Sequence, residues 1–282
     1  MPNYGYHFAR AEGRAVRTVY RALLPSIGRR RGVKRADFPI DVVAFSGEAA
    51  LPEQVASIRS FLEYVGQPRH FTVVSDGTLT RRSSAILKTL SPAVSVSDFE
   101  QWLPKKLPSE IYPYLTSYPT GKQLAVIMSL PMERTTLYID SDVMFFAGAT
   151  DLFQLVEEQR GPALYLADCR LSADERLFRS STEKSNPVNT GALLLFEKLD
   201  WAPAVRRFVE LTGPPNFFTN QTMTHLTMHL NGAFPLDDQK YVLQLDDQFV
   251  YGDRYAGPHL ALRHYVNPVR HKFWTTFFRR NG

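Results

Sequence analysis

From residue 40 onward, short apolar runs of strand length alternate with longer amphipathic runs of helical length. The predicted strands are residues 41–45, 70–74, 94–96, 135–139, 163–167 and 192–196. The predicted helices are residues 52–64, 79–90, 120–130, 201–211 and 221–230. Such alternation favours an α/β fold with a mostly parallel central sheet flanked by helices. The predicted strands end in small or polar residues, which is where open α/β sheets bind ligands.

Cys169 is the only cysteine in the 282 residues, so an intramolecular disulfide is excluded and a reducing cytoplasm is the expected compartment. It follows the apolar run at residues 163–167, which predicts a small buried side chain and not a reactive thiol. The sequence has no apolar run of about 18 residues, so we expect no membrane-spanning helix. It also lacks an apolar N-terminal stretch with a cleavage site, so we expect no signal peptide.

The net charge of +5 comes from the first 35 residues, which hold nine of the 33 basic residues and one of the 28 acidic residues. Residues 1–36 are interpreted as a basic helical leader and linker, in which Pro25 and Gly28 end the helix. Its apolar residues recur at helical spacing: Val16, Val19, Tyr20, Leu23 and Leu24. The leader is either an interfacial helix attracted to anionic lipid or a terminal helix that is solvated or packed on the core. Nucleic acid is not an expected partner, because no nucleic-acid-binding motif accompanies the charges.

Residues 137–146, Leu-Tyr-Ile-Asp-Ser-Asp-Val-Met-Phe-Phe, are the strongest indication of chemistry. Asp140 and Asp142 follow a buried strand directly, and burying two carboxylates is unfavourable unless a partner compensates them. Residues i and i+2 of a strand point the same way, so both carboxylates are predicted to face one divalent cation. Their hard oxygen atoms suit Mg²⁺ or Mn²⁺. The alternative is a turn in which the carboxylates accept hydrogen bonds from nearby backbone amides.

This segment resembles the D-x-D strand of GT-A glycosyltransferases, particularly those of glycosyltransferase family 8. Further segments match that family in order: Asn189-Thr190-Gly191 before the apolar run 192–196, Asn220-Gln221-Thr222 opening a helix, and Arg263-His264-Tyr265 with Lys272-Phe273-Trp274. The resemblance covers about residues 40–275 and leaves the leader outside. It implies a GT-A fold with a Rossmann-like N-terminal half. Residues 37–282 would form a single glycosyltransferase domain, with residues 37–146 as its nucleotide-binding half and residues 147–282 as its acceptor half.

By this resemblance, Asp140, Asp142 and His264 would hold the metal ion, and the histidine nitrogen favours Mn²⁺ over Mg²⁺. The residues that would contact the donor beside the ion are Ser141, Asn189, Thr190 and Gly191. Asn220 and Gln221 would face the reaction centre, where the family has an acid in place of Asn220. An asparagine cannot act as a base or nucleophile, although it can hydrogen-bond sugar hydroxyls. The family implies retention at the anomeric carbon, and the substitution leaves that outcome open.

The remaining positions concern the nucleotide and its diphosphate. Phe45, Ser46 and Asp76 would contact the base and ribose, although Asp76 in Ser-Asp-Gly is equally typical of a turn. Lys122, at the start of a predicted helix, would contact phosphate or sugar, and a solvated lysine is the alternative. Lys272 would contact the diphosphate. Seven residues separate it from His264 where the family usually has five, so Arg270 and His271 are alternatives.

The sequence therefore predicts a metal-dependent glycosyltransferase that moves a sugar from a UDP-sugar to an acceptor hydroxyl. The acceptor is left open between a glycan, a lipid-linked molecule and a small molecule, and the leader allows peripheral contact with the inner face of a membrane. One alternative is a non-catalytic nucleotide-sugar-binding protein. Another is a metal-dependent phosphodiesterase or nucleotidyltransferase, which needs more carboxylates. The pairs at residues 237–238 and 246–247 are candidates for that role, but they are predicted to be solvent-facing turns.

Overall fold

The computed structural model describes residues 3–27 and 36–281, the last four of these by their backbone alone. Its α-helices are α1 (Tyr4–Ile27), α2 (Leu51–Tyr64), α3 (Arg81–Lys88), α4 (Tyr112–Ser117), α5 (Pro119–Met128), α6 (Asp151–Glu158), α7 (Ala202–Val209), α8 (Thr219–Leu230) and α9 (His271–Asn281). Its strands are β1 (Asp37–Ser46), β2 (Gln67–Ser75), β3 (Val94–Asp98), β4 (Thr136–Asp140), β5 (Val143–Phe145), β6 (Ala163–Ala167), β7 (Val188–Leu195), β8 (Phe234–Pro235), β9 (Tyr241–Val242) and β10 (Leu262–His264). Every strand and helix predicted above is present, with ends shifted by a few residues.

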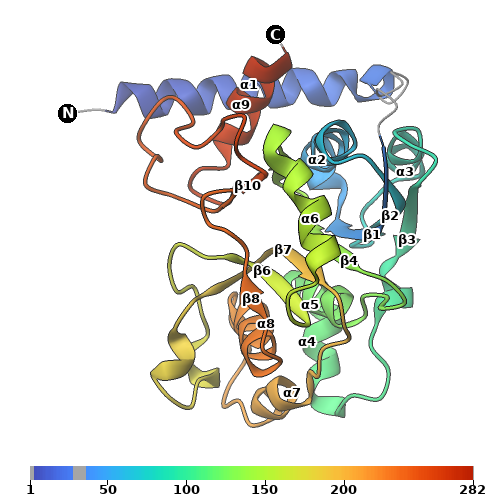
Figure 1. Ribbon diagram of the computed structural model, residues 1–282, viewed down its shortest axis with the longest axis vertical. Coiled ribbons are helices and arrows are strands. Elements are labelled where there is room, and N and C mark those ends of the chain that lie inside the picture. Colours follow the sequence, from blue (N-terminus) through green and yellow to red (C-terminus); the bar gives the residue numbers. More distant parts are fainter. Residues whose placement is uncertain (1–2, 28–35, 282) are drawn as a thin grey trace.

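A seven-stranded mixed sheet forms the centre of the molecule, in the order β3-β2-β1-β4-β7-β6-β8 (Figure 1). The strands from β3 to β4 are parallel, while β7 runs antiparallel to both β4 and β6. A smaller sheet of three strands has the order β5-β10-β9. The α/β fold and its mostly parallel central sheet are therefore confirmed.

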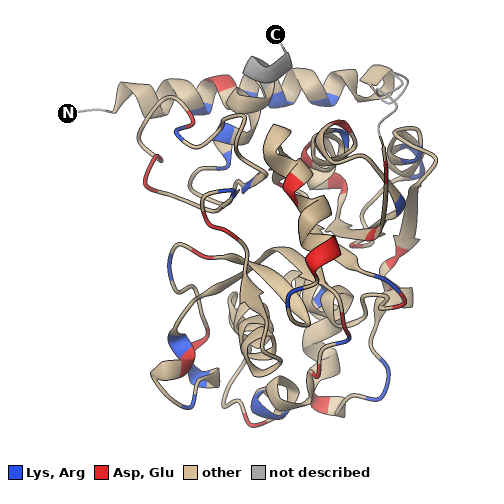
Figure 2. Cartoon of the chain, viewed as in Figure 1, with Lys and Arg blue, Asp and Glu red and all other residues tan. Residues whose placement is uncertain are grey.

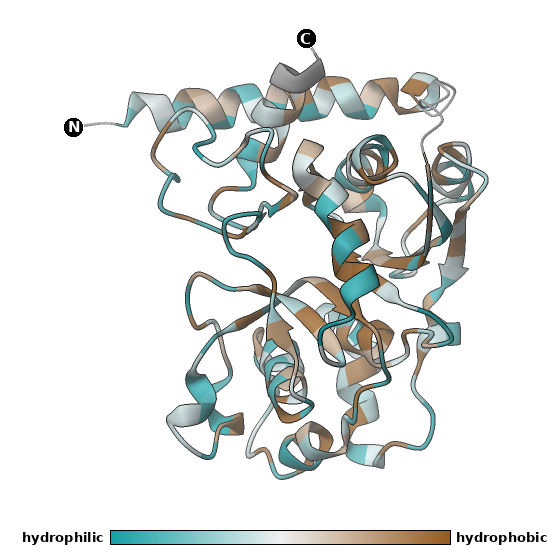
Figure 3. Ribbon diagram, in the orientation of Figure 1, coloured by the Kyte–Doolittle hydropathy of each residue, from teal (hydrophilic) through white to brown (hydrophobic). Residues whose placement is uncertain are grey.

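Side chains of successive residues in β4 enter different hydrophobic clusters. Leu137 and Ile139 pack in a cluster with residues of α1, α2 and α9, whereas Tyr138 packs in a second cluster with residues of α4, α5, α7 and α8. This alternation is the period of a strand buried on both faces. Figure 3 shows hydrophobic residues concentrated on the central strands, between the helices of the two layers. The end of β4 thus lies in the middle of a sheet with both faces covered.

Helix α1 lies across one end of the molecule, where α9 crosses it (Figure 1). Tyr20 and Leu24 are buried in the larger cluster, and Tyr20 packs its ring 5.0 Å from that of Trp274 in α9. Arg17 forms an ion pair of 2.5 Å with Glu53 of α2. The packed terminal helix is thus the observed arrangement, while a boundary at residue 36 stays a prediction. Pro25 does not end the helix as predicted: α1 continues to Ile27, because the fixed φ of proline, about −65°, is itself helical. Gly28 lies outside the described residues.

No strand or helix was predicted beyond residue 230, yet the structure has both at the two ends of the segment from His264 to Trp274. His264 ends β10, and α9 begins at His271. The short strand exists because it pairs with β5, and Phe273 and Trp274 of α9 are buried against distant residues. These stabilising contacts are non-local, so local sequence periodicity does not report them.

Cys169 is exposed and not buried, because β6 ends at Ala167 and the chain enters a surface loop there. Among the described residues, no helix combines the length and the hydrophobicity needed to cross a bilayer.

Candidate metal and donor site

Two strand pairings bring Asp140, Asp142 and His264 together. β4 ends at Asp140 in the centre of the large sheet, and the chain turns before β5 begins at Val143. β5 pairs antiparallel with β10, with Val143 opposite His264. The backbone amide of Tyr265 donates to the Asp142 carbonyl at 3.0 Å. A histidine 122 residues after Asp142 is thereby fixed beside the two carboxylates.

The three side chains form a compact group. His264 Nε2 lies 3.0 Å from Asp142 Oδ1 and 3.5 Å from Asp140 Oδ2. One potential ligand atom from each residue lies within 4.8 Å of the other two. Asp142 and His264 are each 3% exposed, whereas Asp140 is partly exposed. Two carboxylate oxygens and one imidazole nitrogen, held this close, fit a divalent cation and leave its other positions for a substrate.

Asn189 sets the orientation of the His264 ring. Its side-chain oxygen lies 2.9 Å from His264 Nδ1 and accepts a hydrogen bond from the Gly191 amide at 2.8 Å. A proton on Nδ1, donated to Asn189, leaves the Nε2 lone pair directed at the carboxylates. Gly191 lies under the ring, because a Cβ atom at this position would be 2.1 Å from His264 Nδ1. The Asn-x-Gly motif therefore supports the histidine directly.

Burial and neighbouring charge shift the pKa values of all three groups. Burial raises the pKa of Asp140 to about 6. Burial acts in the same direction on Asp142, but the charges and hydrogen bonds of His264 and Arg270 bring the pKa of that carboxyl below its ordinary range. Burial alone would lower the pKa of His264, but Asp142 and Asp140 raise it above its usual value. The pair of carboxylates is thus arranged to hold positive charge.

Two further side chains support Asp140 and were not predicted, Gln123 and Tyr138. Gln123 Nε2 and the Tyr138 hydroxyl donate to Asp140 Oδ1 at 2.7 and 3.0 Å. Asn220 Nδ2 donates to Gln123 Oε1 at 2.8 Å. Asn220 therefore contacts the acidic pair through Gln123. The position of Tyr138, two residues before Asp140 in the same strand, was the available signal for its role.

A cavity of about 570 Å³ opens beside the metal group. The candidate residues that line it are Asp140, Asp142, Asn189, Thr190, Asn220, Gln221 and His264. Asp168 also lines it and was not predicted; its Oδ2 accepts hydrogen bonds from Asn189 Nδ2 and Gln221 Nε2, both at 3.0 Å. Asp168 directly follows β6, so the rule that ligands bind at strand ends was the signal that pointed to it.

Arg270, and not Lys272, reaches this cavity. Arg270 Nε donates to Asp142 Oδ2 at 3.1 Å, and its Nη2 contacts the same oxygen. Five residues separate Arg270 from His264, which is the spacing that the resemblance implies. Lys272 is fully buried, and its ammonium donates to the carbonyls of Val250 and Gly252, each at 2.6 Å. The first turn of α9 thus directs Lys272 away from the cavity.

Asp247 is also buried and not in a solvent-facing turn as predicted. Its carboxylate lies 2.9 Å from Arg263 Nη2 and 3.5 Å from Lys272 Nζ. This ion network satisfies two cations that would otherwise be buried without a partner. It does not line the central cavity, so it offers no second metal site there.

Phe45, Ser46, Asp76 and Lys122 do not line the cavity, although Phe45 lies opposite Asp140 where β1 pairs with β4. Lys122 Nζ donates to the Asp76 carbonyl at 3.1 Å and lies 5.4 Å from the centre of the Phe99 ring. Asp76 Oδ1 accepts a hydrogen bond from the Thr78 amide at 2.8 Å, which is the turn-forming contact predicted as the alternative. Ser141 lies in the turn between β4 and β5 and does not line the cavity either. A nucleotide role for these residues stays a prediction.

No protein-family model matches the chain, and no curated protein matches it. Solved structures do match over most of its length. Galactosyltransferase LgtC, solved with donor and acceptor sugar analogues, is 13% identical, with 85% of this chain and 96% of that chain covered at a TM-score of 0.54. Mouse xyloside xylosyltransferase 1 is 14% identical, with 83% and 99% covered at 0.54. The bifunctional glycosyltransferase WbbM is 13% identical, with 89% of this chain and 51% of that chain covered at 0.53.

At these identities the matches establish the fold alone. The chain has the GT-A fold of glycosyltransferases, and LgtC is a family 8 enzyme with that fold. The Asp140–Asp142–His264 group lies where β4 ends in that fold.

Proposed function

We propose that the protein is a metal-dependent glycosyltransferase that moves a sugar from a UDP-sugar to an acceptor hydroxyl. The observation that carries the proposal is the Asp140–Asp142–His264 group beside a cavity of about 570 Å³ in a GT-A fold. Support for a donor and an acceptor comes from LgtC, which was solved with analogues of both. The chain's own acidic group gives the donor diphosphate a place to bind through a cation.

Asp140, Asp142 and His264 would hold the ion, and the imidazole ligand favours Mn²⁺ over Mg²⁺. The bound ion would supply positive charge to the diphosphate as it leaves the sugar. Asp142 presents Oδ1 on the side of His264 and Oδ2 to Arg270, so the carboxylate can serve both at once. Arg270 adds a fixed, permanently charged guanidinium to the same edge of the cavity, which stabilises negative charge on the leaving group.

Asp168, Asn189 and Gln221 are the residues that we assign to the donor sugar. They line the cavity and are linked through Asp168 Oδ2, which accepts a hydrogen bond from each of the two amides. Charged and amide oxygens fixed in this way orient sugar hydroxyls. Asn220 cannot accept the acceptor's proton as a base, so the departing phosphate is the group to accept it. That course gives retention, with attack on the face from which the diphosphate leaves.

UDP release tests this proposal. Purified protein is incubated with individual UDP-sugars and a panel of glycan, lipid-linked and small acceptors, with Mn²⁺ or with EDTA. We expect UDP release that requires Mn²⁺ and is lost in Asp142→Asn, while Asp238→Asn, an exposed acid outside the cavity, retains it. Release of UMP instead of UDP would identify the phosphodiesterase alternative. Donor binding without any turnover would identify the non-catalytic one.

We also propose that α1 contacts the inner face of a membrane, with the protein in the cytoplasm. The outward face of α1 exposes Tyr4, Phe8, Val19 and Leu23, which are between 49% and 67% exposed. Basic residues are spaced along the same helix (Figure 2). A helix with an apolar stripe on one side and arginines on its other faces is typical of helices that lie in a bilayer surface. Sedimentation with anionic phosphatidylserine vesicles should be strong for the wild type and weak for Phe8→Ser/Val19→Ser, and equal sedimentation would refute the contact.

A further inference from the structure

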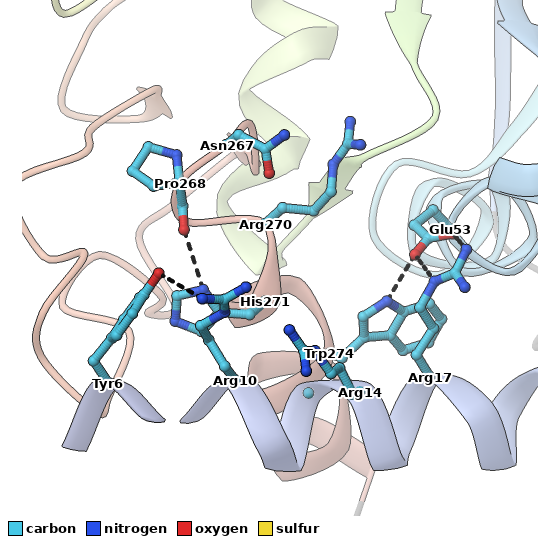
Figure 4. Close-up of a pocket in the computed structure, with 11 residues that line it drawn as sticks. Tyr6, Arg10, Arg14, Arg17, Glu53, Asn267, Pro268, Arg270, His271 and Trp274 are labelled. Atoms are coloured by element: carbon cyan, nitrogen blue, oxygen red, sulfur yellow. Dashed lines mark hydrogen bonds and ion pairs between the residues drawn. The ribbon is translucent and has the colours of Figure 1, made fainter. Parts of the chain in front are cut away.

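A second cavity, of about 390 Å³, lies between α1 and the loop that leads into α9 (Figure 4). Its lining from α1 is Tyr6, Arg10, Gly13, Arg14 and Arg17. The rest of its lining is Glu53, Asn267, Pro268, Arg270, His271 and Trp274. The approach of α1 to α9 depends on Gly13, where a Cβ atom would be 2.5 Å from the His271 carbonyl. The cavity is therefore built by the packing of the basic leader against the catalytic body.

The charges that line this cavity are mostly positive and only partly compensated. Glu53 is the one acid in the lining, and it is engaged by Arg17 at 2.5 and 3.0 Å and by the Trp274 indole at 2.8 Å. Arg10 donates to the Tyr6 hydroxyl at 3.2 Å, a neutral partner. Within the described part of the chain, neither Arg10 nor Arg14 forms an ion pair with an acid. Two guanidinium groups thus remain available to an anion.

His271 adds a polar atom that lacks a partner. Its Nδ1 lies 3.2 Å from the Pro268 carbonyl, and its Nε2 is buried without a hydrogen-bond partner among the described residues. A buried nitrogen without a partner is unfavourable unless a ligand or water completes it. The residue lines the cavity beside Arg10 (Figure 4).

The cavity adjoins the metal and donor site. Asn267 and Arg270 line both cavities. Figure 4 shows the Arg270 guanidinium directed away from α1, and it contacts Asp142 on that far side. Arg270 and an ion in the metal group would neutralise the donor diphosphate. Arg10 and Arg14 are therefore not needed for that role. Because Asn267 and Arg270 line both cavities, a molecule that occupied the two together would pass these residues.

We propose that this second cavity binds a phosphate group carried by the acceptor, through Arg10 and Arg14. The inference rests on the proposed function, because it names a chemical feature of the second substrate. Arginine forms charge-assisted, often bidentate hydrogen bonds with phosphate. The phosphate belongs either to a lipid-borne acceptor, whose chain would follow the exposed apolar face of α1, or to a water-soluble one.

The site is tested without metal or donor by titrating the protein with inorganic phosphate in the presence of EDTA and measuring the heat of binding by calorimetry. Arg10→Gln and Arg14→Gln should each weaken phosphate binding about tenfold, since each removes one charged donor. Arg21→Gln is the matched control, because Arg21 is an exposed arginine of the same helix outside the cavity. Absence of binding by the wild type, or equal loss in Arg21→Gln, would overturn the site. Melting temperatures of the variants confirm that α1 remains packed.

Affinity for UDP with Mn²⁺ separates the acceptor from the donor. It should be unchanged in Arg10→Gln and Arg14→Gln, and a tenfold loss would assign these arginines to the donor and refute the acceptor assignment. Vesicles of phosphatidylcholine with phosphatidic acid distinguish the two sources. Weaker vesicle binding by Arg14→Gln than by Arg21→Gln supports a lipid-borne phosphate, while equal vesicle binding with weaker inorganic phosphate binding supports a soluble one. The phosphate titration needs neither metal nor turnover, so it can succeed where the UDP-release experiment fails, and the two proposals fail separately.

Discussion

The side-chain oxygen of Asn189 lies 2.9 Å from Nδ1 of His264, a residue 75 positions further along the chain. The contact joins β7 to β10, which belong to different sheets. It fixes the imidazole so that Nε2 faces Asp140 and Asp142. We therefore expect a side chain outside the metal group to decide how well that group binds an ion.

Replacing Asn189 with alanine should weaken Mn²⁺ binding about 10- to 100-fold, because outer-shell partners of metal-bound histidines contribute that much. Calorimetric titration with Mn²⁺ measures the change. Asn231→Ala, which removes a helix-end side chain outside the cavity, is the control and should bind Mn²⁺ like the wild type. Unchanged affinity in Asn189→Ala would show that the ring is held by its strand alone.

Gly191→Ala should displace the His264 ring, since the added Cβ atom would lie 2.1 Å from Nδ1. The neighbouring backbone is buried in β7, so the ring is the group that must move. We expect weaker Mn²⁺ binding and, with it, lower UDP release. Gly252→Ala is the matched control, because a Cβ atom there meets nothing within 4 Å. A Gly191→Ala protein with full Mn²⁺ affinity would contradict the tight packing.

The central strands were predictable because each carries its signal in its own residues. β6 was predicted with its observed ends, and the apolar run of β4 stops at Asp140 as expected. The motif segments around Asp140, Asn189 and His264 also identified the residues that come together. In each case a short stretch of sequence contains the apolar run and the polar residue that ends it.

Parts of the site that depend on distant packing were not predictable in the same way. Lys272 and Asp247 lie beyond the last predicted helix, and only the fold shows that they belong to one buried ion network. Arg270 lines the central cavity because α9 begins just after it. The helix depends on its contact with α1, about 250 residues earlier in the sequence, which no local pattern records.

Lys272→Met should destabilise the protein by roughly 3 kcal/mol, because it removes one charge of a buried ion network together with two buried hydrogen bonds. The carbonyls of Val250 and Gly252 would lose their donor, while Asp247 would keep its ion pair with Arg263. Arg270→Met should change stability much less, since the Arg270 side chain is half exposed, but it should weaken UDP–Mn²⁺ binding. Urea unfolding and donor titration of both variants measure the two effects. If Lys272→Met weakened UDP–Mn²⁺ binding and Arg270→Met did not, Lys272 and not Arg270 would be the residue that contacts the diphosphate.

Asp168→Asn should lower turnover while leaving Mn²⁺ affinity unchanged, because Asp168 contacts Asn189 and Gln221 but is not among the metal group. Hydrogen bonds to charged groups contribute about 1.5–3 kcal/mol, so we expect a loss of about 10- to 100-fold. Steady-state UDP release and Mn²⁺ titration give the comparison. Equal losses of turnover and of Mn²⁺ affinity would show that Asp168 supports binding of the ion and not of the sugar.

The ion pair of Glu183 with Arg207 should make the stability difference between the wild type and Glu183→Gln depend on pH. Hydrogen bonding to Arg207, at 2.7 and 2.8 Å, lowers the pKa of Glu183 from 4.5 to about 2. A carboxylate with a lowered pKa contributes stability that is complete above the pKa of its unfolded state and is lost as the pH falls through the folded value. Glu183→Gln should therefore be less stable than the wild type at pH 7, with the difference shrinking between pH 4.5 and about 2. Urea unfolding at pH 7, 5 and 3 measures it, and a difference that grows as the pH falls would mean that the Arg207 pair does not stabilise the fold.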